Sequence, residues 1–150
     1  MKFKKEPAIL IATHGPFCTG LLETVKMIYG ELDNVTAMSL KQGQAVEEYE
    51  KEIEVFLEEH DNDVVLLLDF IGGSPFNTAM KLCRNRELCA VAGVNFGMVA
   101  AAVELRSEYD DSAHLAAEIE KAAHESMKDV TPMLTQMYET AKAIGEDDKE

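Results

Sequence analysis

Apolar and polar positions along the chain follow two periods, one typical of buried strands and one typical of helices. Five consecutive large apolar residues fill positions 64–68, and another apolar run fills 8–12. A run without polar alternation is typical of a parallel strand that is covered on both faces. We therefore predict buried strands at both places, of which the 64–68 run is the central strand and ends at Asp69.

Segments with a helical period separate these runs, because their apolar residues recur every three or four positions. The further predicted elements are strands at 35–40 and 88–94 and helices at about 18–30, 46–57, 75–85, 98–106 and 115–123. Strands that alternate with helices are typical of a doubly wound α/β fold, in which right-handed crossovers cover both faces of a mainly parallel sheet. The strand order that we predict is 2-1-3-4.

The C-terminal stretch carries a mixed pattern. Val130-Thr131-Pro132 predicts a short edge strand, because proline is tolerated at the edge of a sheet, and 133–143 predicts a terminal helix before a charged tail. No internal repeat or linker divides the chain, and its 150 residues are an ordinary length for one domain. We predict a single domain over 1–150, with a core at about 8–131 and a C-terminal helix and tail at 132–150.

The net charge of the chain narrows the range of molecules that it is expected to bind. The chain has 28 acidic and 14 basic residues, which give a formal net charge of −14. Nucleic acids and anionic membrane surfaces bind through Lys and Arg, so this balance argues against both and favours a partner with a basic patch. No apolar run approaches the roughly 18–20 residues that a membrane span needs. The three cysteines show neither metal nor disulfide spacing, which indicates reduced thiols in the core of a cytoplasmic protein.

Candidate chemistry gathers where the first and third strands end. Ligands of doubly wound sheets collect beyond the carboxyl ends of the strands. His14 follows the first strand, Asp69 ends the third, and Gly72-Gly73-Ser74 opens the next helix with Ser74 as the expected N-cap. If the first and third strands are neighbours, the imidazole, the carboxylate and the glycine turn face one another.

This combination suits a histidine that accepts a phosphoryl group. Asp69 can accept a hydrogen bond from Nδ1–H of His14, which leaves Nε2 as the nucleophile. The amides of Gly72, Gly73 and Ser74, the start of the helix and the Ser74 hydroxyl can hold the anionic group. The turn lacks the lysine of a Walker loop and any adjacent carboxylate pair, so we expect no nucleotide cofactor and no metal.

Each of these residues also has an ordinary structural role, since glycine, serine, proline and aspartate are common in strand-to-helix turns. Their combination at one sheet edge favours the functional interpretation. Cys18 is close to His14 in the sequence, but it lies in the apolar stripe of the first helix, so core packing is favoured over a Cys/His site. The other histidines show no ligand spacing and are expected at the surface; they are His60, His114 and His124.

Three segments resemble a known family. They are Thr13-His14-Gly15, the stretch Asp-Phe-Ile-Gly-Gly-Ser-Pro-Phe-Asn at 69–77, and Ala-Gly-Val-Asn-Phe-Gly-Met at 92–98. They are similar to the IIA component of the mannose-family, phosphoenolpyruvate-dependent sugar phosphotransferase system (PTS), and the resemblance covers about 8–131. It implies that His14 accepts a phosphoryl group at Nε2 from the carrier HPr and passes it to a IIB component, which serves the membrane components IIC and IID.

The same resemblance implies further features of the protein. Asp69 would orient His14, and Ser74 would contact the phosphoryl group. The protein would be a homodimer in which a short antiparallel C-terminal strand crosses to the partner. The chain departs from the family pattern at Phe70-Ile71, where well-known members have Thr-Trp or Leu-aromatic pairs, and at Gly97, where they usually have proline. Both departures lie beside the site, so they bear on partner or sugar preference more than on phosphotransfer.

Two other functions stay open at this point. The same phosphorylation can serve a regulatory module that reports sugar supply instead of serving transport. A flavodoxin-like flavin or nucleotide binder also fits the fold, but Pro16-Phe17 stand where its phosphate loop would need small residues. The identity of the sugar does not follow from this sequence, because specificity in such a system belongs to the membrane components.

Overall fold

The computed structural model describes residues 5–109 and 111–149. The elements in chain order are β1 (Ala8–His14), α1 (Phe17–Tyr29), β2 (Val35–Leu40), α2 (Val46–Glu59), β3 (Val64–Leu68), α3 (Ser74–Leu82), β4 (Cys89–Ala92), α4 (Phe96–Leu105), α5 (Ser112–Ser126) and α6 (Thr131–Asp147). Strands and helices alternate as far as α4, as the sequence pattern predicts for a parallel sheet.

The four strands form one parallel sheet in the order β2-β1-β3-β4, so the predicted order is confirmed. In the two central strands every residue of β3 is buried, and so is every residue of β1 except the last. Ala12 of β1 stands beside Leu68 of β3 in the register of the sheet. The carboxyl ends of these neighbouring strands therefore meet at one edge.

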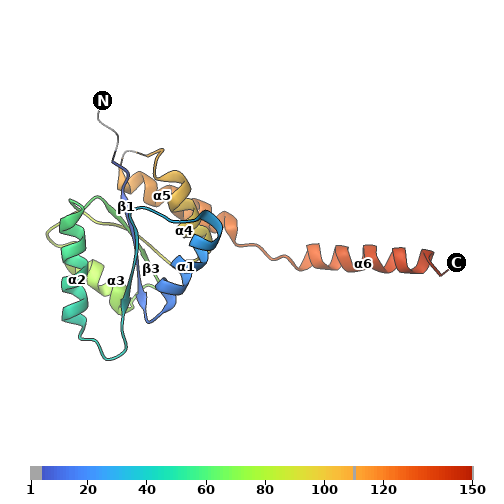
Figure 1. The fold of residues 1–150 in the computed structure, drawn as a ribbon, viewed down its shortest axis with the longest axis horizontal. Coiled ribbons are helices and arrows are strands. Elements are labelled where there is room, and N and C mark those ends of the chain that lie inside the picture. Colours follow the sequence, from blue (N-terminus) through green and yellow to red (C-terminus); the bar gives the residue numbers. More distant parts are fainter. Residues whose placement is uncertain (1–4, 110, 150) are drawn as a thin grey trace.

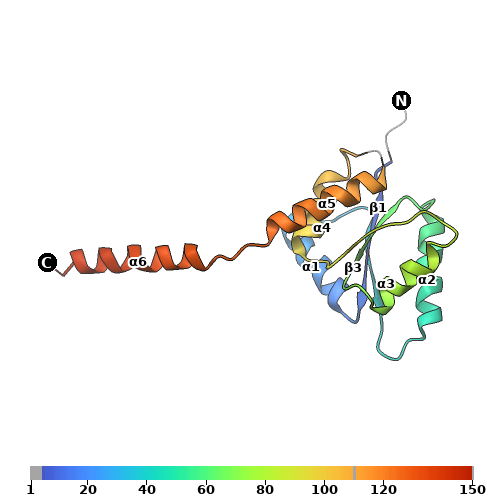
Figure 2. The same ribbon diagram turned by 180° about the vertical axis from the view of Figure 1, so that it is seen from behind.

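Helices cover both faces of the sheet. Figures 1 and 2 show α2 and α3 on one face and α1, α4 and α5 on the other. Side chains of β1 alternate between the two resulting cores: Ile9 and Ile11 pack among residues of α1, α4 and α5, and Leu10 packs among residues of α2 and α3. This alternation explains why the strand is apolar at every position.

In α3 the apolar spacing of the sequence predicts a buried face of Phe76, Ala79, Met80 and Cys83, and this prediction is wrong by one position. The buried residues of this helix are Pro75, Thr78, Ala79 and Leu82. Met80 is 55% exposed, and Cys83 lies just beyond the helix and is exposed too. Because one residue turns a helix by about 100°, a polar threonine in the buried stripe was enough to shift the expected face. Cys83 is therefore no core thiol, whereas Cys18 is buried as expected.

The C-terminal segment differs from its prediction. Val130 is the N-cap of α6 and Pro132 lies in its first turn, so the edge strand expected at 130–132 is wrong. Proline is accommodated there because the first turn of a helix leaves its N–H groups unused in any case. None of the residues Thr131–Asp147 is buried, and Figures 1 and 2 show α6 standing away from the sheet and its covering helices.

Across residues 5–109 and 111–149, the helices fall short of the combined length and hydropathy required for crossing a membrane.

Candidate functional site

The structure brings His14 and Asp69 together at the carboxyl edge of the sheet. His14 is the last residue of β1, not two residues beyond it, and Asp69 directly follows β3. Nδ1 of His14 lies 2.6 Å from Oδ2 of Asp69, and the His14 backbone N–H donates to the same oxygen at 2.8 Å. The Phe70 N–H donates to the other oxygen at 3.0 Å. The pairing expected from the sequence is thus present in the geometry.

The state of the pair follows from these contacts. Burial raises the pKa of the Asp69 carboxyl, but hydrogen bonds from the His14 backbone, the His14 ring and the Phe70 backbone outweigh it, so the pKa is lowered. An ionised carboxylate only accepts hydrogen bonds, so Nδ1 carries the proton. The Asp69 side chain is 10% exposed and that of His14 is 42% exposed. The ring is therefore anchored at Nδ1 and open to solvent, and the neutral form of this ring carries its lone pair on Nε2.

The rest of the imidazole contacts two residues, Phe70 and Gly73, that the sequence pattern does not place at the histidine ring. The ring of Phe70 stacks on it, with centroids 5.2 Å apart and planes 14° from parallel. Gly73 lies so close that an added Cβ would stand 2.8 Å from Cε1 of His14 and 2.8 Å from Cζ of Phe70. The sequence alone indicates Phe70 only as a departure from the family pattern beside the site. The structure makes it a direct neighbour of the histidine.

Gly73 places the first turn of α3 next to the imidazole of His14. The N-cap is Gly73 and Ser74 is the first helical residue, so the expected N-cap at Ser74 is wrong by one position. The Asn77 N–H donates to the Gly73 carbonyl at 2.9 Å, and the Asn77 side-chain amide donates to the Gly72 carbonyl at 3.1 Å. These two bonds fix the glycine turn against the helix.

Donors for an anion remain at this helix end. A helix leaves its first N–H groups without intrahelical acceptors, and here those groups belong to Ser74 and Phe76, because Pro75 has none. The Gly73 N–H makes only a long turn bond of 3.4 Å to the Phe70 carbonyl. Such an N-terminus is suited to a phosphoryl group, since its amides and its dipole both favour negative charge.

Replacing Gly73 by alanine tests how closely the backbone must approach the imidazole. The added Cβ cannot be accommodated unless His14 or Phe70 moves, so we expect phosphoryl acceptance on His14 to slow by roughly 10- to 100-fold, in keeping with the cost of misplaced reacting groups. The measurement is single-turnover labelling from a phosphorylated donor. Gly20→Ala is the matched control, because an added Cβ in α1 meets nothing within 4 Å. Equal slowing of both variants would contradict the packing argument.

The other candidate residues lie apart from this site or serve the fold. Cys18 is buried, and its N–H donates to Oγ1 of Thr13 at 2.9 Å, so Thr13 helps to fix the start of α1. His60 bonds the Phe56 carbonyl through Nδ1 at 2.8 Å. His124 on α5 pairs with Glu120 at 3.7 Å. Within the described parts of the chain, no three His, Cys, Asp or Glu side chains are grouped closely enough to hold a metal ion.

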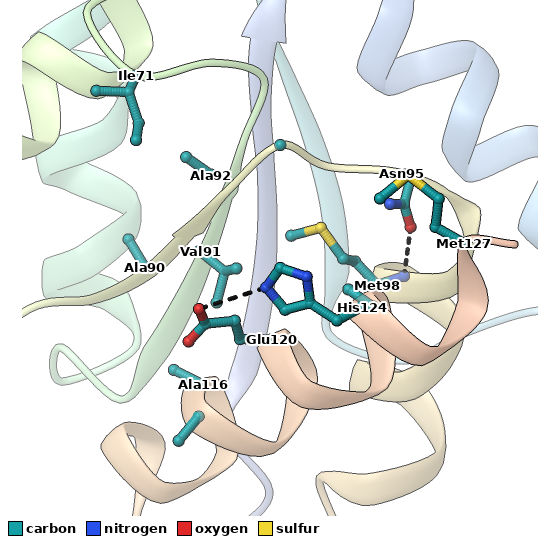
Figure 3. Close-up of a pocket in the computed structure, with 13 residues that line it drawn as sticks. Ile71, Ala90, Val91, Ala92, Asn95, Met98, Ala116, Glu120, His124 and Met127 are labelled. Atoms are coloured by element: carbon teal, nitrogen blue, oxygen red, sulfur yellow. Dashed lines mark hydrogen bonds and ion pairs between the residues drawn. The ribbon is translucent and has the colours of Figure 1, made fainter.

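A separate groove of about 620 Å³ runs along the open edge of β4. Figure 3 shows it between β4, with Ala90 and Ala92, and the side of α5 that carries Glu120 and His124. Met127 lines it where α5 ends. Neither His14 nor Asp69 lines this groove, so it is distinct from the site that these two residues form.

The fold and the site define a class: a doubly wound α/β protein with a histidine–carboxylate pair at the carboxyl edge of its sheet. The EIIA-man family model, described as PTS system fructose IIA component, matches residues 8–120. The chain belongs to this family of PTS IIA components, as the sequence resemblance predicted. Membership supports, in general terms, a phosphotransfer role in sugar transport.

Individual relatives agree with the family. The PTS fructose-specific EIIA component of Bacillus subtilis is 31% identical over 104 residues, which cover 66% of this chain and 70% of that protein. The PTS mannose-specific EIIAB component of Escherichia coli K12 is 32% identical over 127 residues, or 81% of this chain. The match spans only 39% of the Escherichia coli protein, which is much longer than this chain.

Solved structures show the same fold. The PTS IIA protein associated with the fucose utilization operon from Streptococcus pneumoniae is 31% identical, with a TM-score of 0.72, and the match covers 89% of this chain and 99% of that one. The mannose/sorbose-specific IIA subunit from Enterococcus faecalis is 26% identical, with a TM-score of 0.73, covering 83% and 95%. These neighbours support the parallel sheet with its covering helices.

Proposed function

We propose that this protein is a phosphohistidine carrier of a sugar phosphotransferase system, which accepts a phosphoryl group from phospho-HPr on His14 and passes it to a IIB component. One observation carries the proposal: Asp69 holds Nδ1 of His14 at 2.6 Å while the ring stays 42% exposed. A carrier needs this combination, because its nucleophilic nitrogen must be fixed in tautomer and still reach two different partner proteins.

The chemical step follows from the same geometry. The lone pair on Nε2 of His14 attacks phosphorus, a P–N bond forms, and the bond from phosphorus to the donor breaks with its electron pair leaving on the donor. The ring then carries positive charge, which the ionised Asp69 stabilises. The amides at Ser74 and Phe76, with the Ser74 hydroxyl, hold the phosphoryl oxygens. Onward transfer reverses these steps with IIB as the acceptor, and the proposed mechanism uses no cofactor or metal.

The proposal extends to the assembly and the setting. We propose a homodimer that acts in the cytoplasm and reaches the membrane components IIC and IID only through IIB. The groove along β4 and the stretch 127–130, which is neither helix nor strand and begins with Met127 in an extended conformation, support the exchange of a C-terminal segment between subunits. The relatives are named for fructose, mannose and sorbose, so the proposal covers sugars of this system without choosing one.

The test is a reconstituted phosphotransfer chain. Incubating the protein with phosphoenolpyruvate, enzyme I and HPr should give a phosphate that is labile in acid and stable in base, as expected for phosphohistidine. Adding a IIB component of the same family should then remove the label from this protein. Absence of any label would contradict the carrier function. Label that no IIB component removes would favour the regulatory alternative over transport.

A further inference from the structure

Helix α6 exposes an apolar side that no other part of the described chain (5–109 and 111–149) covers. Its large apolar side chains include Leu134, Met137 and Ile144, which are 65%, 69% and 60% exposed. The helix has 17 residues, none of them buried, and stands away from the rest of the molecule (Figures 1 and 2). Isolated helices of this length are marginal in water, because most helical stability comes from packing an apolar face. The helix therefore needs a partner.

The spacing of the apolar side identifies the kind of partner. Val130, Leu134, Met137, Ala141 and Ile144 follow one another at intervals of four, three, four and three residues, which is the seam of a coiled coil. The positions that flank this seam carry no charge up to Gly145; they are Thr131, Met133, Tyr138, Thr140 and Gly145. The charged residues Glu139, Lys142 and Glu146 lie on the opposite side. In a chain of net charge −14, such an uncharged strip permits close approach of another copy.

We propose that α6 pairs in antiparallel orientation with α6 of a second copy of this chain. The charges of the helix favour this orientation. Its first turn has no acidic residue and its last turn no basic one, while Glu146 and Asp147 stand at the negative end of its dipole. An antiparallel second helix places its positive N-terminus beside these carboxylates. A parallel one would place two acidic ends side by side.

Side-chain sizes along the seam match the same orientation. An antiparallel pair centred on position 139 sets Met137 opposite Ala141 and Leu134 opposite Ile144. The large side chain of Met137 then faces the small one of Ala141, which lets these layers interdigitate, and Leu134 packs against Ile144 as an apolar pair.

This pairing concerns residues 130–147 and is independent of whether His14 accepts a phosphoryl group. It is also separate from the segment exchange proposed above, which would use the groove along β4. The experiment must therefore detect contacts of α6 itself and not the oligomeric state alone.

Two variants of the full-length protein that each place one cysteine in α6, Met137→Cys and Ala141→Cys, provide the test. Each also carries Cys83→Ser, which removes the exposed native thiol and leaves the buried Cys18 and the partly buried Cys89. A short bismaleimide should link subunits in an equal mixture of the two variants and link either variant alone much less. Mass spectrometry of the linked peptides should identify position 137 joined to position 141. Efficient linking of Met137→Cys with itself would indicate a parallel pair and overturn the proposal, as would links from α6 to Cys89 or other body residues, or no link at all.

A matched pair of charge substitutions controls for damage to the helix. Ile144→Asp, added to both cysteine variants, places a carboxylate in the seam and should abolish the 137–141 link. Ala143→Asp adds the same carboxylate one position away on the outer side and should leave the link in place. Because Ala143→Asp costs at least as much helix propensity as Ile144→Asp, equal loss of the link in both variants would contradict pairing through this seam. None of these readouts requires phosphotransfer, so failure of the pairing and failure of the carrier function are distinguishable.

Discussion

Replacing His14 by alanine is expected to reduce phosphoryl uptake from phospho-HPr to background, a loss on the order of at least 10³-fold. The reason is chemical: alanine has no nitrogen to attack phosphorus, and Cys18, the other nucleophile nearby in sequence, is fully buried. The fold should survive the change, because the histidine side chain is 42% exposed and packs mainly at the rim of the sheet. The measurement is transfer of labelled phosphate from phosphoenolpyruvate through enzyme I and HPr.

His124→Ala is the matched control for this variant. Like His14, His124 pairs with a carboxylate, that of Glu120, and its imidazole is 73% exposed. It lies on α5, outside the site. We expect labelling of His124→Ala at the rate of the unchanged protein. Label that persists in His14→Ala would assign the acceptor to a different residue, and loss of label in both variants would point to a failure of folding or of donor recognition.

The sequence predicted the sheet well because the apolar runs of its two central strands are typical of buried parallel strands. Five apolar residues without polar alternation at 64–68 require cover on both faces, and the run at 8–12 requires the same. Once two such strands are neighbours, their ends converge, so the meeting of His14 and Asp69 follows from the topology. This part of the site could be predicted from the sequence because it depends on strand order and not on the packing of individual side chains.

The parts that the sequence missed depend on local packing. Gly73 lies so close to the imidazole and the Phe70 ring that a side chain would not fit, and it takes the N-cap position expected for Ser74. Phe70 stacks on His14 from the turn in which Gly72 has a φ of 93°, a backbone conformation that no hydrophobic pattern reveals. At the C-terminal end, Pro132 is as compatible with the first turn of a helix as with an edge strand, and the pattern alone could not separate the two.

Asparagine at position 69 should slow phosphoryl transfer by on the order of 10²- to 10⁴-fold, while His14 itself stays in place. The carboxylate accepts three hydrogen bonds: two at Oδ2, from the backbone and the ring of His14, and one at Oδ1, from the Phe70 N–H. An amide of the same size has only one oxygen and introduces a donor. It therefore either opposes the Phe70 N–H or faces the imidazole with N–H groups, which moves the ring proton to Nε2 and removes the nucleophilic lone pair.

Two readouts separate this positioning role from a general loss of structure. Nitrogen NMR of His14 should show the proton on Nδ1 in the unchanged protein and a substantial population with the proton on Nε2 in Asp69→Asn. Ser112→Ala is a useful control, because it removes a hydrogen bond to another carboxylate, Asp63, away from the site. Transfer at the unchanged rate in Asp69→Asn, with an unaltered tautomer, would contradict the role assigned to the carboxylate.

The Asp69→Asn substitution should also change how the stability of the protein depends on pH. Hydrogen bonds to the ionised form lower the pKa of Asp69 in the folded protein below its ordinary value of 3.8. A group with a depressed folded pKa contributes stability above its unfolded pKa and loses that contribution as pH falls through the folded value. The difference in unfolding free energy between the unchanged protein and Asp69→Asn should therefore shrink as the pH falls below 3.8. Urea unfolding of both proteins across this acid range measures it, and a difference that stays constant would mean that Asp69 has the same pKa in the folded and unfolded states.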